Sequence, residues 1–185
     1  MKRIFLTLAI LGTLLLIAAF VLGLEIGDPQ SVSAGTRRLM SYHLLISVAA
    51  LIFAALVHVV VFLTYFMGTS RWMEEARLAY KLDTRWNQEN RRLKYRAIPL
   101  MAACLVVLIL NIPLGAIAVD RGNWTLPGGH EFSPSTVHFA FAILTIVVNL
   151  AVNAIEYKAI ERNSELIGEV VQEVRRIRQE HGLPT

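Results

Sequence analysis

Long apolar runs separated by short polar segments dominate the pattern of residues along this chain. Four runs have the length that an α-helix needs to cross about 30 Å of hydrocarbon, about 18 residues or more at about 1.5 Å per residue. They cover residues 4–24, 42–66, 98–119 and 137–157, and their only charged residue is Glu156, near the end of the fourth. The pattern predicts an all-α integral membrane protein, built as a bundle of four transmembrane helices.

Composition supports this fold class. The chain has 185 residues, of which 55% are hydrophobic and only 17% are charged, and a soluble domain would interleave the two kinds more evenly. The first apolar run is longer than the core of a cleaved signal peptide, which has roughly 7 to 15 residues. We therefore expect residues 4–24 to remain in the protein as its first membrane helix.

The distribution of basic residues predicts an orientation. Of the 18 Lys and Arg residues, 15 lie before the first run, between the second and third, or after the fourth. Under the positive-inside rule these segments are cytoplasmic, so both termini face the cytoplasm and the protein resides in the inner (cytoplasmic) membrane. Because topology explains the formal net charge of +4, no nucleic-acid partner is needed.

Residues 68–97 and 158–185 form the predicted cytoplasmic part of the protein. Residues 71–96 contain neither Gly nor Pro and favour a helix, with Trp72 and Trp86 as interfacial anchors. After the bundle of residues 1–157, apolar positions spaced by three, four or seven predict an amphipathic C-terminal helix that packs on 71–96 or on a second subunit. They are Ile160, Ile167, Val170, Val174 and Ile177. The Gly-, Pro- and Ser-rich segments 25–40 and 120–136 read as loops.

Three histidines fall inside the predicted spans, where ionisable groups are costly and usually functional. His43 and His138 stand near the beginnings of the second and fourth runs, which cross the membrane in the same direction. We expect them at one depth, close to the outer boundary. His58 lies about four turns deeper than His43, on the same helix face.

Small and polar residues accompany these histidines. Ser47, Ala50 and Ala54 lie between His43 and His58 on the second helix and predict a groove, although small residues also serve close helix packing. The third helix contributes two further positions, and the fourth has a polar face. These residues are Asn111 and Gly115 on the third helix, and Thr145, Asn149, Asn153 and Glu156 on the fourth. Asn153 follows His138 at the spacing that separates His43 from His58, so we expect it opposite His58.

Two histidines that face each other from different helices at one depth suit axial ligation of haem iron. In architecture and histidine placement the chain resembles the membrane cytochromes b built as four-helix bundles, such as the haem-bearing anchors of quinone-linked dehydrogenases. The resemblance implies haem b between the second and fourth helices, with His43 and His138 as ligands. It also implies electron exchange with a quinone or a partner subunit. His58 is a possible further ligand, but Asn153 stands where an inner haem would need a second histidine.

Other interpretations remain open at this stage. His43 and His138 can instead lie at the headgroup boundary, or join His130 and Glu131 in a copper or zinc site. His58 can be a quinone or proton contact, or a core histidine bonded to Asn149 or Asn153. The lone cysteine, Cys104, excludes covalently attached haem and iron–sulfur clusters. With no catalytic motif present, the alternative function is an accessory or scaffold subunit that binds other membrane subunits or its own copies.

Overall fold

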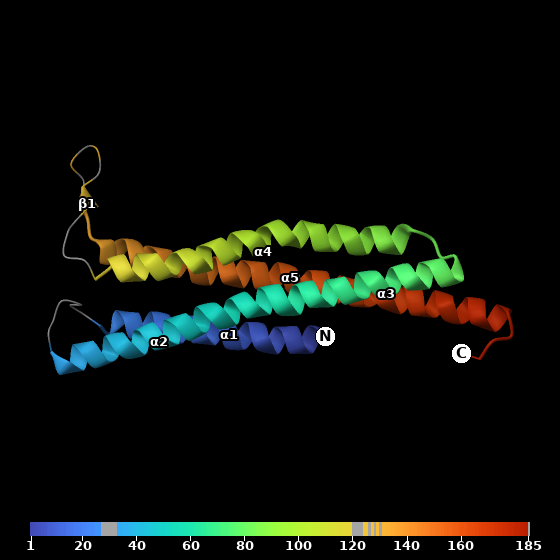
Figure 1. Ribbon diagram of the computed structural model, residues 1–185, viewed down its shortest axis with the longest axis horizontal. Coiled ribbons are helices and arrows are strands. Elements are labelled where there is room, and N and C mark those ends of the chain that lie inside the picture. The colour runs from blue at the N-terminus through green and yellow to red at the C-terminus, as the bar shows by residue number, and fades with distance from the viewer. Residues whose placement is uncertain (27–32, 120–123, 126, 128, 130, 185) are drawn as a thin grey trace.

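The computed structural model describes residues 1–26, 33–119, 124–125, 127, 129 and 131–184, and nearly all of these residues are helical. The helices are α1 (Lys2–Leu24), α2 (Ala34–Leu56), the π-helix η1 (Val57–Leu63), α3 (Thr64–Tyr80), α4 (Arg85–Ile117) and α5 (Pro134–Glu180). Two short strands, β1 (Trp124–Thr125) and β2 (Glu131–Phe132), pair antiparallel between α4 and α5. Together the elements form one elongated bundle (Figure 1).

Four helices in this structure are long and apolar enough to cross a membrane, as the sequence predicts. They are α1, the continuous rod of α2, η1 and α3, then α4, and finally α5. Large apolar side chains cover their outer surfaces, with Leu44, Leu45 and Ile109 each more than 60% exposed. Such a surface is stable against lipid and would be unfavourable in water.

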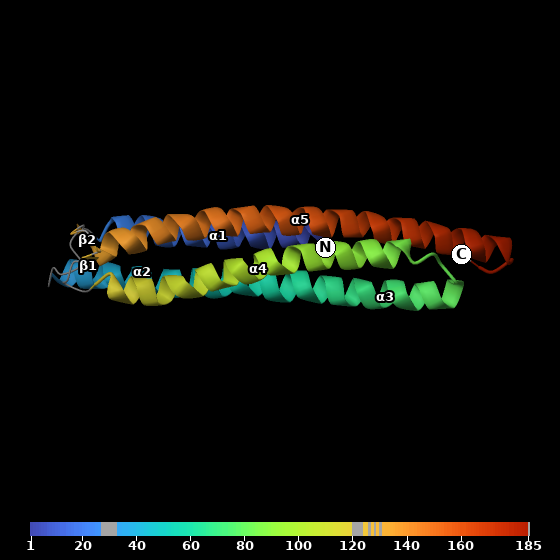
Figure 2. The ribbon, with the colours of Figure 1, turned by 90° about the horizontal axis from the view of Figure 1, so that it is seen from above.

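The bundle has four helices along one half and three along the other. Helix α1 begins about halfway along the bundle, beside the middle of α5, and runs to one end, while α3, the beginning of α4 and the end of α5 extend in the other direction (Figures 1 and 2). We call the end that carries the α1–α2 connection and the two strands the loop end. At the opposite end, Met73, Leu82, Trp86, Leu166 and Val170 form a separate buried core for the three-helix half.

The prediction of a loop over residues 25–40 is wrong for its second half. Helix α2 begins at Ala34, because the hydroxyl of Ser33 accepts a hydrogen bond of 3.1 Å from the backbone N–H of Thr36 and caps the helix. Residues 27–32 lie outside the described residues. The segment 120–136 also departs from a plain loop, since it contains the strand pair.

The prediction of a single helix over residues 71–96 is also wrong. Helix α3 ends at Tyr80 and α4 begins at Arg85, with Lys81 in the left-handed region at a φ of 53°. The carboxylate of Asp83 then accepts a hydrogen bond of 2.7 Å from the N–H of Arg85. The physical reason for the turn is connectivity, because two antiparallel membrane helices require the chain to reverse between them.

Trp86 is not the interfacial anchor that its position suggested. Its side chain is 6% exposed, in the core of the three-helix half, and its indole N–H donates a hydrogen bond of 3.0 Å to Glu169 on α5. Nearby, Arg162 on α5 forms an ion pair of 2.7 Å with Glu89 on α4. These contacts join α5 to the beginning of α4. Helix α5 itself runs without interruption through residue 158, where the C-terminal helix was expected to begin.

The left-handed Lys81 gives a stability prediction. For a residue with a Cβ this backbone conformation costs roughly 1–2 kcal/mol, and glycine adopts it without that cost. We expect Lys81→Gly to raise the free energy of unfolding by about 1 kcal/mol and Lys81→Val to lower it. Thermal unfolding of the purified protein in detergent measures both. Equal midpoints for the two variants would show that this turn does not limit stability.

Candidate cofactor site

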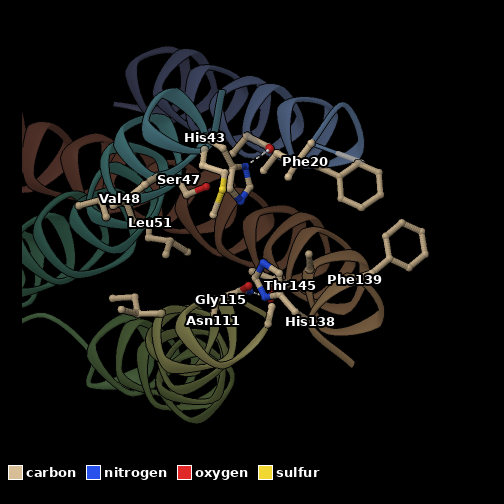
Figure 3. Close-up of a pocket in the computed structure, with 18 of the residues that line it drawn as sticks. Phe20, His43, Ser47, Val48, Leu51, Asn111, Gly115, His138, Phe139 and Thr145 are labelled. Carbon is tan, nitrogen blue, oxygen red and sulfur yellow. Dashed lines mark hydrogen bonds between the residues drawn. The ribbon is translucent and has the colours of Figure 1, made fainter. Parts of the chain in front are cut away.

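A cavity of about 550 Å³ lies between the helices at the loop end of the bundle. Helices α1, α2, α4 and α5 all contribute to its wall, which is mainly apolar. Its volume is within the range of about 300–1,000 Å³ that is usual for small-molecule and cofactor sites. His43 from α2 and His138 from α5 lie opposite each other across it (Figure 3). We call it the two-histidine cavity.

The ring of His43 is held by helix α1. Its Nδ1–H donates a hydrogen bond of 2.9 Å to the backbone carbonyl of Ala19, shown as a dashed line in Figure 3. A carbonyl can only accept, so this bond places the proton on Nδ1 and leaves the lone pair on Nε2. A backbone carbonyl is a common second partner of histidines that ligate metals, since it fixes the tautomer and the ring orientation.

The ring of His138 is held by helix α4 in a different way. A Cβ added to Gly115 would lie 3.3 Å from Cε1 of His138, so the absence of a side chain there lets the ring approach α4 closely. Gly23 on α1 makes similar room for His43, where the corresponding distance to Cε1 is 3.0 Å. Nδ1 of His138 is buried and has no hydrogen-bond partner, which is costly for a polar atom in apolar surroundings.

The two rings are separated by a distance that suits one bridging metal. Their centroids lie 6.4 Å apart, and the ring planes are inclined at 78°. Metal–imidazole bonds of about 2.0–2.1 Å, with about 1.2 Å from each nitrogen to its ring centre, separate two trans imidazoles by about 6.4 Å. The centroid distance is therefore compatible with one ion held by both imidazoles.

Polar and aromatic side chains complete the wall. Asn111 on α4 donates a hydrogen bond to the hydroxyl of Thr145 on α5, and this hydroxyl donates in turn to the carbonyl of Phe141 at 2.8 Å. Phe20 and Phe139 stack at a centroid distance of 5.5 Å and point away from the two histidines (Figure 3). Because Asn111 and Thr145 satisfy each other, the histidines are the groups in this wall that can bind a ligand by nitrogen.

The structure brings together some of the residues predicted for the site. Four of them line the cavity with His138, namely His43, Ser47, Asn111 and Gly115. Five others lie outside its lining, namely Ala50, Ala54, His58, Asn149 and Asn153. Ala50 and Ala54 are buried in the core beyond the cavity, against Leu16, Cys104 and Val152, where small side chains let the helices pack closely. The groove predicted from the small residues is therefore filled by neighbouring side chains in that part of the bundle.

The described residues contain no group of three or more His, Cys, Asp or Glu side chains placed to hold a metal ion. The predicted copper or zinc site included His130, which lies outside the described residues. Two imidazoles can still ligate a metal whose remaining ligands come from a macrocycle.

No family model, no curated protein and no solved structure matches this chain. The properties of the site are therefore argued from its own residues.

His58 belongs to a second polar cluster, deeper in the bundle than the two-histidine cavity. Its Nδ1 lies 2.8 Å from Oε2 of Glu156, and its Nε2 donates a hydrogen bond of 3.1 Å to Asn149. Cys104 on α4 adds a contact of 3.5 Å from Sγ to Nε2. Since the side chains of His58 and Glu156 are both fully buried, the cluster joins α2–η1, α4 and α5 through groups that water does not reach.

His58 lies within a π-helical segment. The helix that begins as α2 changes over Val57–Leu63 from α- to π-helical, and His58 is its second residue. Short π-helical segments occur often at functional positions in helices, and they shift the side chains that follow to a new face. Residues 57–63 contain no Pro or Gly, so the periodicity of the sequence did not predict the change from α- to π-helix.

The prediction that Asn153 lies opposite His58 is wrong. Asn149 and Glu156, four residues before and three residues after it, contact the imidazole instead. Oδ1 of Asn153 and Oε1 of Glu156 are buried without a hydrogen-bond partner. Glu156 is the functional candidate that sequence reasoning missed. Its place on the polar face of the fourth run could have indicated a role. Its position near the end of that run suggested exposure instead of burial.

The buried pair gives a prediction on stability. We expect His58→Leu and Glu156→Leu each to lower the free energy of unfolding by about 3–5 kcal/mol, because each leaves a buried charged or polar partner alone. The double variant should lose clearly less than the sum of the two, since it removes both groups together. Equilibrium unfolding of the purified protein in mixed micelles measures this coupling.

Glu161→Leu is the matched control. Glu161 forms an exposed ion pair of 2.7 Å with Lys2, and exposed pairs contribute little to stability. Losses that simply add in the double variant would refute an energetic coupling between His58 and Glu156.

Proposed function

We propose that this protein is a membrane electron-transfer subunit that holds haem b in the two-histidine cavity, with His43 and His138 as the axial ligands. The observation that carries the proposal is their geometry. Two imidazoles from different helices stand 6.4 Å apart across an apolar cavity, and one of them has its ligating nitrogen free of the proton. Both features are what bis-histidine ligation requires.

The donor set favours haem over a bare ion. A zinc or copper ion held only by protein needs three or four ligands, and the cavity wall offers two imidazoles among mainly apolar side chains. A porphyrin supplies the other four nitrogens itself and buries its large flat faces against apolar residues. The chemistry that the bound group would supply is the gain and loss of one electron at iron.

Specific residues of this chain would position the two imidazoles for haem binding. The carbonyl of Ala19 holds the His43 ring and keeps Nε2 available, while Gly23 and Gly115 give the two rings space. Nδ1 of His138 has no partner in the protein, so ligation of this ring would offset the cost of its burial. The apolar wall excludes water and thereby stabilises the ligated state.

The positive-inside rule supports the orientation. With 15 of the 18 basic residues outside the loop end, both termini and the α3–α4 turn face the cytoplasm, and the two-histidine cavity lies near the opposite surface of an inner membrane. Electrons would therefore enter or leave close to that surface, from a quinone in the lipid or from a partner subunit. The cytoplasmic helical extensions of α3, α4 and α5 provide a surface for such a subunit.

Haem content tests this proposal directly. We expect protein purified in mild detergent, from cells supplied with haem precursor, to show a reducible Soret band and α-band. His43→Ala and His138→Ala should lose both bands, because one axial ligand is missing. Pyridine haemochrome analysis measures the haem bound per chain.

His181→Ala serves as the control, since His181 is exposed and bonds only to the carbonyl of Ile177 at 2.8 Å in its own helix. Colourless wild-type protein that remains folded would end the cytochrome proposal and leave the scaffold function.

The glycines that make room for the imidazoles give an independent prediction. A methyl group at Gly23 or Gly115 would lie 3.0 Å or 3.3 Å from the ring that it faces, so Gly23→Ala and Gly115→Ala should push the histidines out of place. We expect the haem affinity of each variant to fall by roughly tenfold or more, as it does when other groups that orient metal ligands are altered. Competition for haem with an apo-globin measures the affinity.

Gly68→Ala on α3 is the matched control, because nothing lies within 4 Å of the added methyl group. Unchanged affinity in the two test variants would mean that the rings need not hold their present positions to bind haem.

A further inference from the structure

A second cavity, of about 530 Å³, lies between α3 and α4 in the three-helix half of the bundle, far from the two-histidine cavity. Its lining residues are polar by type and combine cations with hydroxyl and amide groups. Residues that line it include Ser70, Arg77, Asn87, Arg91, Lys94 and Tyr95. We call it the basic groove. Among these residues, Arg91 and Lys94 take no part in the helix contacts described above or in the proposed haem site.

The groove carries uncompensated positive charge. Its one acidic side chain, Glu74, accepts two hydrogen bonds of 2.6 and 3.1 Å from Arg77 and a further one of 2.6 Å from Asn87. The guanidinium of Arg77 lowers the pKa of Glu74, so this carboxylate is ionised and already paired. Within the part of the chain that the structure describes, Arg91 and Lys94 have no carboxylate within 4.0 Å. Arg91 and Lys94 therefore face the groove without a direct ion pair to a carboxylate.

The position of the groove along the helices fixes its depth. The apolar runs end at residue 66 and begin again at residue 98, so Ser70 and Lys94 each lie four residues beyond the hydrocarbon. At about 1.5 Å per residue this is about 6 Å, the level of the lipid headgroups. The side chains of Trp72 and Tyr95 at the same level are 39% and 58% exposed, as in the aromatic belts of membrane proteins.

We propose that the basic groove binds the phosphodiester headgroup of an anionic phospholipid, held by Arg91 and Lys94 between α3 and α4. An arginine and a lysine supply the fork of donors and the point charge that phosphate oxygens prefer. The phenol of Tyr95 lines the same wall and is a further neutral hydrogen-bonding group. Basic pockets beside membrane helices on the cytoplasmic side characteristically select such lipids over zwitterionic ones.

The bound lipid would hold the two helices at the point where they leave the membrane. Here α3 and α4 are joined by a polar bridge in which Ser70 donates a hydrogen bond of 2.5 Å to Asn90, and Asn90 donates one of 2.6 Å to Asn163 on α5. A headgroup between Arg91 and Lys94 would lie beside this bridge and add a second connection. The inference does not depend on haem, since it uses other residues at the other end of the bundle.

Retention of lipid by the full-length protein tests the inference. The protein is placed in nanodiscs of phosphatidylcholine with a minor fraction of phosphatidylglycerol, and lipid that remains bound after transfer to mild detergent is counted by native mass spectrometry. We expect retained phosphatidylglycerol to be enriched over phosphatidylcholine. Arg91→Gln and Lys94→Gln should each weaken its retention about fivefold, and the double variant about thirtyfold, as expected for about one charge contact each.

The control removes the same charge from the same helix. Arg92 and Arg96 are exposed, lie outside the groove and form no ion pair among the described residues, so the double variant Arg92→Gln/Arg96→Gln should retain the lipid. Equal loss in the two double variants, with circular dichroism unchanged, would overturn the inference in favour of general surface attraction. Retention of both lipids alike would also overturn it, as would displacement of the lipid by inorganic phosphate at millimolar concentration.

Discussion

The structure depends on one constraint, which is that polar groups buried between apolar helices must find their partners inside the bundle. Helix α5 supplies most of these groups on a single face, at Thr145, Asn149, Glu156 and Asn163. Their spacings of four and seven residues keep them on one side of a helix with 3.6 residues per turn. Together they contact α3, α4 and His58 in η1, so α5 determines how these helices align along their axes.

The contacts of this face occur at successive levels. Thr145 meets Asn111 on α4 near the loop end, and Glu156 meets His58 where α2 becomes η1. Further along, Asn163 bonds to Asn90 on α4 and, at 3.0 Å, to Thr69 on α3. Apolar packing tolerates sliding of one helix past another, whereas a slip of one turn would leave these groups unpaired in a dry interior. The polar contacts thus fix a register that the hydrophobic effect leaves open.

The two-histidine cavity is one of the places where the bundle leaves this constraint unmet, as are Oδ1 of Asn153 and Oε1 of Glu156 in the deeper cluster. Elsewhere most buried polar atoms have partners, but here an apolar wall surrounds two imidazoles that do not bond to each other, and one has a buried nitrogen without a partner. Folding retains such a site only if it is compensated by the rest of the structure or by a ligand. A metal bound by both imidazoles would fill the cavity and bond to ring nitrogens. The proposal of haem rests on this local conflict.

The sequence by itself determined the class of the protein and the candidates for its chemistry. Uncharged runs long enough to span a bilayer give four membrane helices, because a helix satisfies all its backbone hydrogen bonds within one segment, and equal depth on parallel helices placed His43 and His138 at one level. Which side chains meet was decided only by the tertiary structure. His58 bonds to Asn149, one of its two expected partners, and contacts Glu156 in place of Asn153, while Ala50 and Ala54 are packing contacts. Depth along a helix follows from counting residues, but rotation about its axis and the reversal at Lys81 depend on neighbours far away in the chain.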